Sequence, residues 1–232
     1  KQLSDLGADV IELPTIRIEH PDDKLGFAEL VATTHEYDWI VFTSPNGVEK
    51  FFEAFYGAYT DARSIGGVRI AAVGPGTARQ INNYRFAVDL MPEKHVAEEL
   101  VNEFIEKESV ENQRILWVHP EGARPVVSEG LTALGAIVDD CIAYKTVAET
   151  EDPTGAVASL KEKGADVITF ASASAAENFQ ALGLDWPEGC KVASIGPVTS
   201  RALTELKMVP HIEAKSHTIP GLVEAIVEDL SE

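Results

Sequence analysis

An internal repeat is the feature that most constrains how this chain of 232 residues can fold. Four segments of the first half recur, in the same order, in the second half. LSDLGADVIEL at 3–13 recurs as LTALGAIVDDC at 131–141, and VFTSPNGVEKFF at 41–52 recurs as TFASASAAENFQ at 169–180. AAVGPGTARQI at 71–81 recurs as VASIGPVTSRAL at 192–203, and KHVAEEL at 94–100 recurs as SHTIPGL at 216–222. The conserved order predicts a duplicated structural unit that has lost one short loop segment.

Strand-like and helix-like patterns alternate within each copy of the repeat. Short β-rich apolar runs lie at 38–43, 69–73, 114–118, 166–170 and 191–195, and amphipathic helical patterns lie at 47–55, 96–107, 126–134, 174–182 and 220–230. This alternation is typical of parallel sheets covered by helices. We therefore expect an α/β protein of two similar lobes, each a doubly wound parallel sheet.

The two copies are unequal at their beginnings. The second copy has the segment RILWVHPEGARPVVSEG at 114–130 before its Leu131, whereas only Lys1 and Gln2 precede the equivalent Leu3. We expect an equivalent strand and turn to precede the first copy, so that the chain begins inside a helix.

Composition excludes several classes of function. The formal net charge of −19 argues against nucleic-acid and anionic-membrane partners, although a local helix end can still bind a small anion. No apolar run is long enough for a membrane-spanning helix. Cys141 and Cys190 lack metal or redox spacing and predict reduced thiols of a cytoplasmic protein. The histidines show no metal-ligand spacing and no Ser-His-Asp pattern occurs, so we expect neither a metal nor another cofactor.

Two Gly-Pro turns occupy equivalent positions of the repeat. Gly74 and Gly196 each follow a strand and precede a helix, whose first N–H groups can bind an anion. Thr77 and Thr199 could cap these helices or donate a hydroxyl to a ligand. The alternative is an ordinary strand-to-helix turn. Neither turn fits the GxGxxG pattern, which disfavours a dinucleotide. The serines of the TSPNG and ASASA turns, Ser44 and Ser172, are helix caps by default.

The series of motifs resembles the uroporphyrinogen-III synthase family. The motifs are FTSPNGV at 42–48, AVGPGTA at 72–78, a LxxLGAxV–AYKTV segment ending at 147, a second F-x-S-x-S at 170–174, and IGPVTSRAL at 195–203. Each motif alone is common, whereas the ordered series is fairly specific and covers nearly the whole chain. The sequence departs from the family pattern because it lacks the first strand and its Thr-Arg-Pro turn.

The resemblance implies a particular chain path. One lobe combines residues 1–13 with 148–232, the other comprises 19–141, and residues 14–18 and 142–147 form a two-stranded connector. A cleft between the lobes is then the expected ligand site.

The resemblance also implies an activity. Family members cyclise hydroxymethylbilane, a linear tetrapyrrole with eight carboxylates, to uroporphyrinogen III. Water is lost, an azafulvene forms, and the last pyrrole ring is inverted through a spiro intermediate. We therefore expect a cofactor-free lyase of haem biosynthesis that acts as a monomer on a small-molecule tetrapyrrole. A non-catalytic two-lobed module that binds polycarboxylates, or senses them, stays open as the alternative.

Tyr144 is the candidate catalytic residue. It lies in AYKTV, its repeat counterpart is Ile16, and the resemblance assigns this tyrosine to the active site. A phenol keeps its proton at neutral pH, so it can assist a departing hydroxyl. His119 and Arg124, in the HPEGAR turn, could face the cleft or belong to a solvated loop. The candidate substrate-binding residues are Ser44, Gly74, Thr77, Arg124, Ser172, Gly196 and Thr199.

Overall fold

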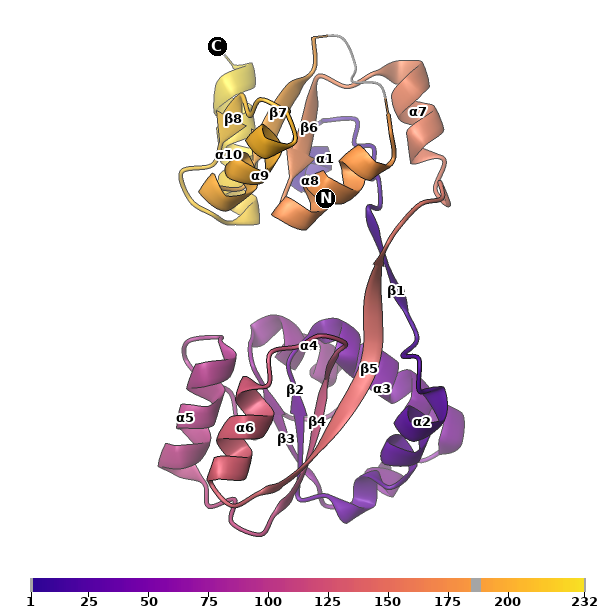
Figure 1. The fold of residues 1–232 in the computed structure, drawn as a ribbon, viewed down its shortest axis with the longest axis vertical. Coiled ribbons are helices and arrows are strands. Elements are labelled where there is room, and N and C mark those ends of the chain that lie inside the picture. The colour runs from indigo at the N-terminus through magenta and orange to yellow at the C-terminus, as the bar shows by residue number, and fades with distance from the viewer. Residues whose placement is uncertain (1, 185–188, 232) are drawn as a thin grey trace. The chain divides into compact units, whose positions relative to one another are not determined.

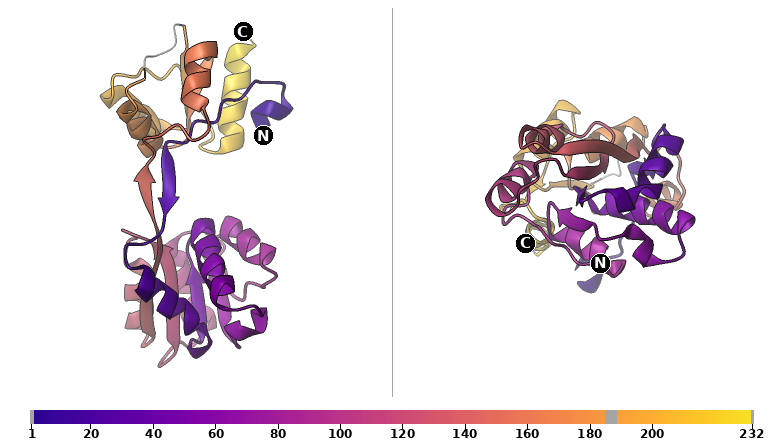
Figure 2. Two further views of the ribbon diagram at one scale, coloured as in Figure 1. Left: turned by 90° about the vertical axis from the view of Figure 1, so that its right-hand side faces the viewer. Right: turned by 90° about the horizontal axis from the view of Figure 1, so that it is seen from below.

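The computed structural model describes residues 2–184 and 189–231, and its chain divides into two compact units. Unit 1 comprises Lys1–Arg17 with Val147–Glu232, and unit 2 comprises Ile18–Thr146 (Figure 1). Two strands, β1 (Ile16–Glu19) and β5 (Ile137–Ala148), pass from one unit into the other along the chain. They are neighbours in one sheet and run in opposite directions (Figure 2).

Unit 2 is built on a parallel sheet. The strand order is β1-β5-β4-β2-β3, and β3, β2, β4 and β5 pair in parallel. Its helices, 3₁₀ turns and remaining strands, in chain order, are α2 (Lys24–Ala32), η1 (Thr34–Glu36), β2 (Trp39–Phe42), α3 (Pro45–Ala58), η2 (Ala62–Ile65), β3 (Arg69–Ala72), α4 (Pro75–Asn83), α5 (Ala97–Lys107), β4 (Arg114–Pro120) and α6 (Val126–Ala133).

Helices cover both faces of this sheet, so all four residues of β2 are buried. Phe42 packs with the helices α2, α3 and α4 on one face, and its ring lies edge-on to that of Phe51 at 5.3 Å. Trp39 packs with α5 and α6 on the other face, where its ring meets Phe104 at 5.0 Å. Successive side chains of β2 point to opposite faces of the sheet, and each packs into the hydrophobic core on its own face.

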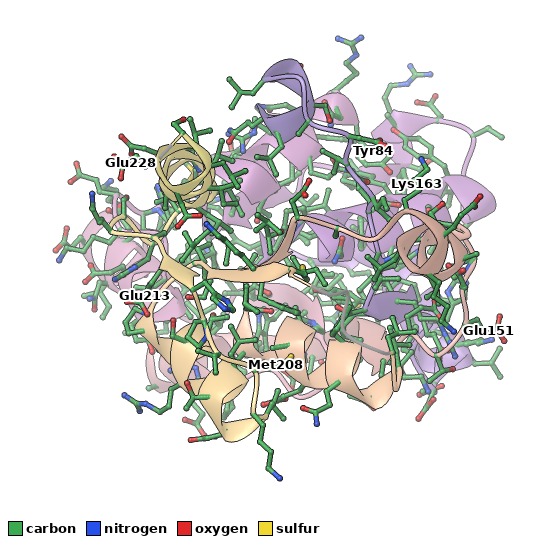
Figure 3. The ribbon with its side chains drawn as sticks, turned by 90° about the horizontal axis from the view of Figure 1, so that it is seen from above. Tyr84, Glu151, Lys163, Met208, Glu213 and Glu228 are labelled. Atoms are coloured by element: carbon green, nitrogen blue, oxygen red, sulfur yellow. The ribbon has the colours of Figure 1, made fainter. Side chains whose placement is uncertain are left out.

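Unit 1 has the same layered design around a smaller parallel sheet of order β6-β7-β8. Val192 and Ala193 of β7 pack into separate clusters, with α7, α8 and α9 on one side and α1 and α10 on the other. Figure 3 shows this unit from above, with Glu213 on β8 and Glu228 on α10. Its elements are α1 (Gln2–Asp5), α7 (Ala156–Lys163), β6 (Val167–Phe170), α8 (Ala173–Ala181), β7 (Lys191–Ser194), α9 (Pro197–Glu205), β8 (Ile212–Glu213) and α10 (Ile219–Leu230).

The predicted α/β class with doubly wound parallel sheets is confirmed. The expected strands and helices end within a few residues of the observed ones, and β8 is an additional strand that the pattern did not indicate. In the described part of the chain, every helix is too short or too polar to cross a membrane.

Candidate functional site

The phenol of Tyr144 meets the hydroxyl of Ser44 inside unit 2. Tyr144 lies on β5 and is only 5% exposed, and its Oη is 2.9 Å from Ser44 Oγ. Ser44 is the N-cap of α3, and its Oγ accepts a hydrogen bond from the Gly47 N–H at 3.0 Å. Pro45 at the first helical position lacks an N–H and suits this helix start. The cap therefore fixes the hydroxyl that meets the phenol.

A β-bulge determines which way Tyr144 points. The pairing of β4 with β5 shifts from His119 opposite Ile142 to Pro120 opposite Tyr144, which leaves Ala143 as an extra residue. Ala143 and Tyr144 consequently pack into the same core cluster, although neighbours in a regular strand face opposite sides of a sheet. The Glu121 N–H donates to the Tyr144 carbonyl at 2.8 Å and closes the bulge. The bulge thus turns Tyr144 onto the face where Ser44 lies.

The two Gly-Pro turns begin helices in the same way, one in each unit. Gly74 is the N-cap of α4 and Gly196 is the N-cap of α9, and each is followed by proline. Neither N-cap supplies a side chain to the first-turn N–H groups, whereas Ser44, Ser172 and Thr218 do so for their own helices. These two helix starts therefore keep backbone donors for an anion.

Thr77 and Thr199 are not helix caps. Each is the third residue of its helix, 4% and 3% exposed respectively. Their hydroxyls have no hydrogen-bond partner within the described ranges, 2–184 and 189–231. A small residual exposure leaves each hydroxyl able to meet a ligand at the helix start.

Ser172 and Arg124 are engaged within the protein. Ser172 caps α8 by accepting from the Ala175 N–H at 3.1 Å, which agrees with its default interpretation. The exposed Arg124 guanidinium donates to Glu98 Oε1 at 2.8 Å. This ion pair neutralises part of the charge that a substrate carboxylate would use.

His119 does not lie in a solvated loop, as one interpretation of the sequence suggested. It belongs to β4, is 6% exposed, and its ring stacks on Trp117 with centroids 3.8 Å apart. Nδ1 is 2.9 Å from the Pro120 carbonyl, and Nε2 is 3.8 Å from Asp140 Oδ1. Burial lowers the pKa of His119, because the low-polarity surroundings disfavour the charged ring, and Pro120 and Asp140 offset part of this effect.

A separate cavity of unit 2 contains none of the candidate residues. It lies along β5 and α2 and includes Asp22, Asp23, Glu29 and Asp140. The Tyr37 hydroxyl donates a hydrogen bond to Asp139 there at 2.8 Å. The pKa of this phenol is raised, mainly because the side chain is buried and secondly because the Asp139 carboxylate accepts its proton in a hydrogen bond. Its largely acidic lining is unsuited to a polycarboxylate.

The features that orient Tyr144 depend on residues far apart in the sequence and were not predicted. The Ser44–Tyr144 contact joins residues 100 positions apart. Pro120 is a weak signal for the bulge, because proline cannot donate to a neighbouring strand, but nothing in the sequence indicates its position opposite Tyr144.

Known proteins with similar sequence and fold share one function. The chain matches the HEM4 family model, described as uroporphyrinogen-III synthase HemD, over residues 1–224. It is 33% identical to the uroporphyrinogen-III synthase of Synechococcus elongatus, with 97% of this chain and 88% of the relative covered. The chloroplastic uroporphyrinogen-III synthase of Oryza sativa is 29% identical, with 95% and 72% covered. The crystal structure of uroporphyrinogen-III synthetase from Helicobacter pylori has the same fold, with a TM-score of 0.63 at 16% identity and 92% and 90% covered. The chain therefore belongs to the uroporphyrinogen-III synthase family.

Proposed function

We propose that this chain converts hydroxymethylbilane to uroporphyrinogen III with Tyr144 as the proton donor. The observation that carries the activity is the family match, which extends over residues 1–224. The chain is accordingly a lyase of tetrapyrrole biosynthesis. Its substrate is a tetrapyrrole. The relatives from Synechococcus elongatus and Oryza sativa are both named uroporphyrinogen-III synthase, so a non-catalytic binding module is not favoured.

The first step is loss of the substrate hydroxyl. The bond between the hydroxymethyl carbon and its oxygen breaks, the Tyr144 O–H supplies a proton, and the oxygen leaves as water. The pyrrole nitrogen provides the electron pair, which produces an azafulvene. The terminal ring attacks the azafulvene carbon through the ring carbon that already bears its methylene bridge, which forms a spiro intermediate. The old bond from that ring carbon to the bridge then breaks and leaves a second azafulvene on the neighbouring ring. The free α carbon of the terminal ring bonds to this azafulvene carbon, so the ring is inverted and the macrocycle closes. Closure ends with loss of a proton from carbon, which restores the aromatic pyrrole and can return a proton to Tyr144.

Ser44 sets the direction of the Tyr144 proton in this proposal. Its oxygen already accepts the Gly47 N–H, so its own O–H can donate to Tyr144 Oη across the 2.9 Å contact. The phenol proton is then free to point at the leaving hydroxyl. Ser44 thus acts as a positioning residue through Tyr144.

The glycine turns hold the carboxylates of the substrate. Gly74 and Gly196 leave backbone N–H groups at two helix starts, and the Thr77 and Thr199 hydroxyls lie beside them. Ser172 supplies a further hydroxyl, and Arg124 contributes by exchanging its bond to Glu98 for one to the substrate. Backbone donors of this kind hold an anionic ligand without a basic surface, which reconciles the substrate with a net charge of −19.

We also propose that the protein works as a monomer in the cytoplasm without a nucleic-acid partner. The support is its acidity, which disfavours nucleic acids, and the absence of metal or redox spacing around its two cysteines, Cys141 and Cys190.

Isomer analysis tests the activity directly. Hydroxymethylbilane closes without help to the type I isomer, so the enzyme is detected by the type III fraction after oxidation to porphyrin. We expect type III product from the purified chain. Type I alone, from a folded preparation, would rule out the synthase activity.

A further inference from the structure

We propose that His95 and His217 bind carboxylates of the substrate, one histidine in each unit. The proposal rests on the proposed function and adds two recognition residues to it. The two histidines are equivalent in the repeat, because each follows its Gly-Pro turn by 21 residues, from Gly74 to His95 and from Gly196 to His217.

Each histidine rests against the glycine of its own turn. A Cβ atom added to Gly74 would lie 3.1 Å from His95 Cβ, and one added to Gly196 would lie 2.6 Å from His217 Nδ1. Side chains larger than glycine would displace the imidazole at 2.6 Å. The glycine therefore serves the histidine as well as the turn, and the same packing occurs independently in both units.

Both rings are oriented by a backbone carbonyl. His95 Nδ1 is 3.2 Å from the Pro92 oxygen, and His217 Nδ1 is 3.2 Å from the Ile195 oxygen. A carbonyl only accepts hydrogen bonds, so Nδ1 carries the proton and donates. Nε2 then has no hydrogen-bond partner in the parts of the chain that the structure describes. Since both side chains are exposed, each Nε2 is available to a ligand.

The helix ends around each histidine favour an anion beside its Nε2 atom. His95 precedes Val96, the N-cap of α5, and lies against the start of α4. His217 precedes Thr218, the N-cap of α10, and lies against the start of α9. Each imidazole thus lies between two helix N-termini, where a carboxylate is stabilised. A ring that carries a proton on both nitrogens donates a charge-assisted Nε2–H hydrogen bond to a carboxylate, which adds to the backbone contacts.

The nearby lysines already have partners. Lys94 Nζ is 3.7 Å from Glu99, and Lys215 Nζ is 3.0 Å from Glu228, the helix α10 residue labelled in Figure 3. Each of these ammonium groups is therefore held near a carboxylate of the protein, whereas each histidine Nε2 has no hydrogen-bond partner in the parts of the chain that the structure describes.

Glutamine substitutions distinguish recognition from packing. His95→Gln and His217→Gln keep a polar side chain but cannot carry a positive charge. We expect each to raise KM for hydroxymethylbilane about tenfold, the size of one lost charge-assisted hydrogen bond, with kcat changed less than twofold. The double variant should show about a hundredfold increase, because the sites lie in separate units and share no partner. His20→Gln, at an exposed histidine that follows β1 and has no counterpart in the Gly-Pro repeat, is the matched control.

Steady-state kinetics of type III formation, with melting temperatures of all variants, decide the question. A double variant with wild-type KM would overturn the proposal, and a lowered melting temperature with unchanged KM would make the histidines packing residues. If His217→Gln does not fold, His217→Asn offers a shorter amide at the same position. Failure of the wild-type chain to make type III product would instead refute the proposed function.

Discussion

Tyr144 Oη lies 2.9 Å from Ser44 Oγ because a helix cap and a β-bulge bring the two side chains to one face of the sheet. Ser44 is held by its helix and Tyr144 by the extra residue Ala143. Neither side chain would reach the other if β5 alternated regularly, since Tyr144 would then face α5 and α6. The relationship gives the phenol a defined direction before any substrate binds.

Replacing Tyr144 by phenylalanine removes this phenol and keeps the ring. If the phenol protonates the leaving hydroxyl, the rate of type III formation should fall by about 10²–10⁴, the usual scale for a positioned acid, while substrate binding changes little. If positioning of the substrate dominates, the loss should be nearer tenfold. The measurement is the type III rate after subtraction of spontaneous type I product. Tyr56→Phe, on the exposed side of α3, is the control, and a wild-type rate for Tyr144→Phe would reduce this residue to a packing role.

Ser44→Ala should lower kcat by about tenfold, because loss of one hydrogen bond to Tyr144 weakens the orientation of its proton. The variant also loses a helix cap, which costs about 1 kcal/mol of stability. Asp23→Ala separates the two effects, since Asp23 caps α2 by accepting the Gly26 N–H at 2.8 Å and does not touch Tyr144. Equal kcat values for the Ser44 and Asp23 variants would contradict the positioning role.

Local sequence patterns predict most of this fold. The run WIVF of β2 is apolar at every position, as a strand buried on both faces must be, and Ser44 and Ser172 have the side chains that helix caps require. The repeat adds the long-range information that the two halves share a design. These signals depend only on neighbouring residues and on internal comparison, so no structure is needed to find them.

The features that shape the candidate site depend on register and packing instead. The bulge at Ala143 is a shift in register that places Pro120 opposite Tyr144, and a single sequence contains no record of that pairing. His119 resembled a turn residue because Pro120 and Glu121 follow it, yet β4 continues through Pro120 and buries the imidazole. Thr77 resembled a cap, but the N-cap of α4 is Gly74, three residues earlier, and the helix begins at Pro75.

Gly196→Ala should raise KM more than Gly74→Ala. The added methyl group would lie 2.6 Å from His217 Nδ1 in the first case and 3.1 Å from His95 Cβ in the second, so only the first must displace a ring. The methyl group at position 196 also blocks the close approach of a substrate carboxylate to the backbone. Gly57→Ala on α3, where a Cβ meets nothing within 4 Å, is the control and should be active. Similar KM values for the Gly196 and Gly57 variants would argue against an anion site at this turn.

The stability of the protein should fall in mild acid because of His119. Burial lowers the pKa of this imidazole in the folded protein. The unfolded chain therefore takes up the proton at a higher pH than the folded protein does. The stabilisation from keeping His119 neutral is present above the unfolded value of about 6.5 and is lost progressively as the pH falls through the folded value.

Urea unfolding of the wild type and His119→Gln between pH 8 and pH 5 isolates this contribution. Glutamine does not titrate, so the free energy of unfolding of the variant should fall less steeply below about pH 6.5, by at most about 1.4 kcal/mol per pH unit. The other histidines cancel in the difference, since they are the same in both proteins. Asp140, whose Oδ1 is 3.8 Å from Nε2, offsets part of the effect, so His119→Gln in an Asp140→Asn background should reveal a larger difference from its own parent. Parallel curves for wild type and variant would mean that His119 is as easily protonated in the folded protein as in the unfolded chain.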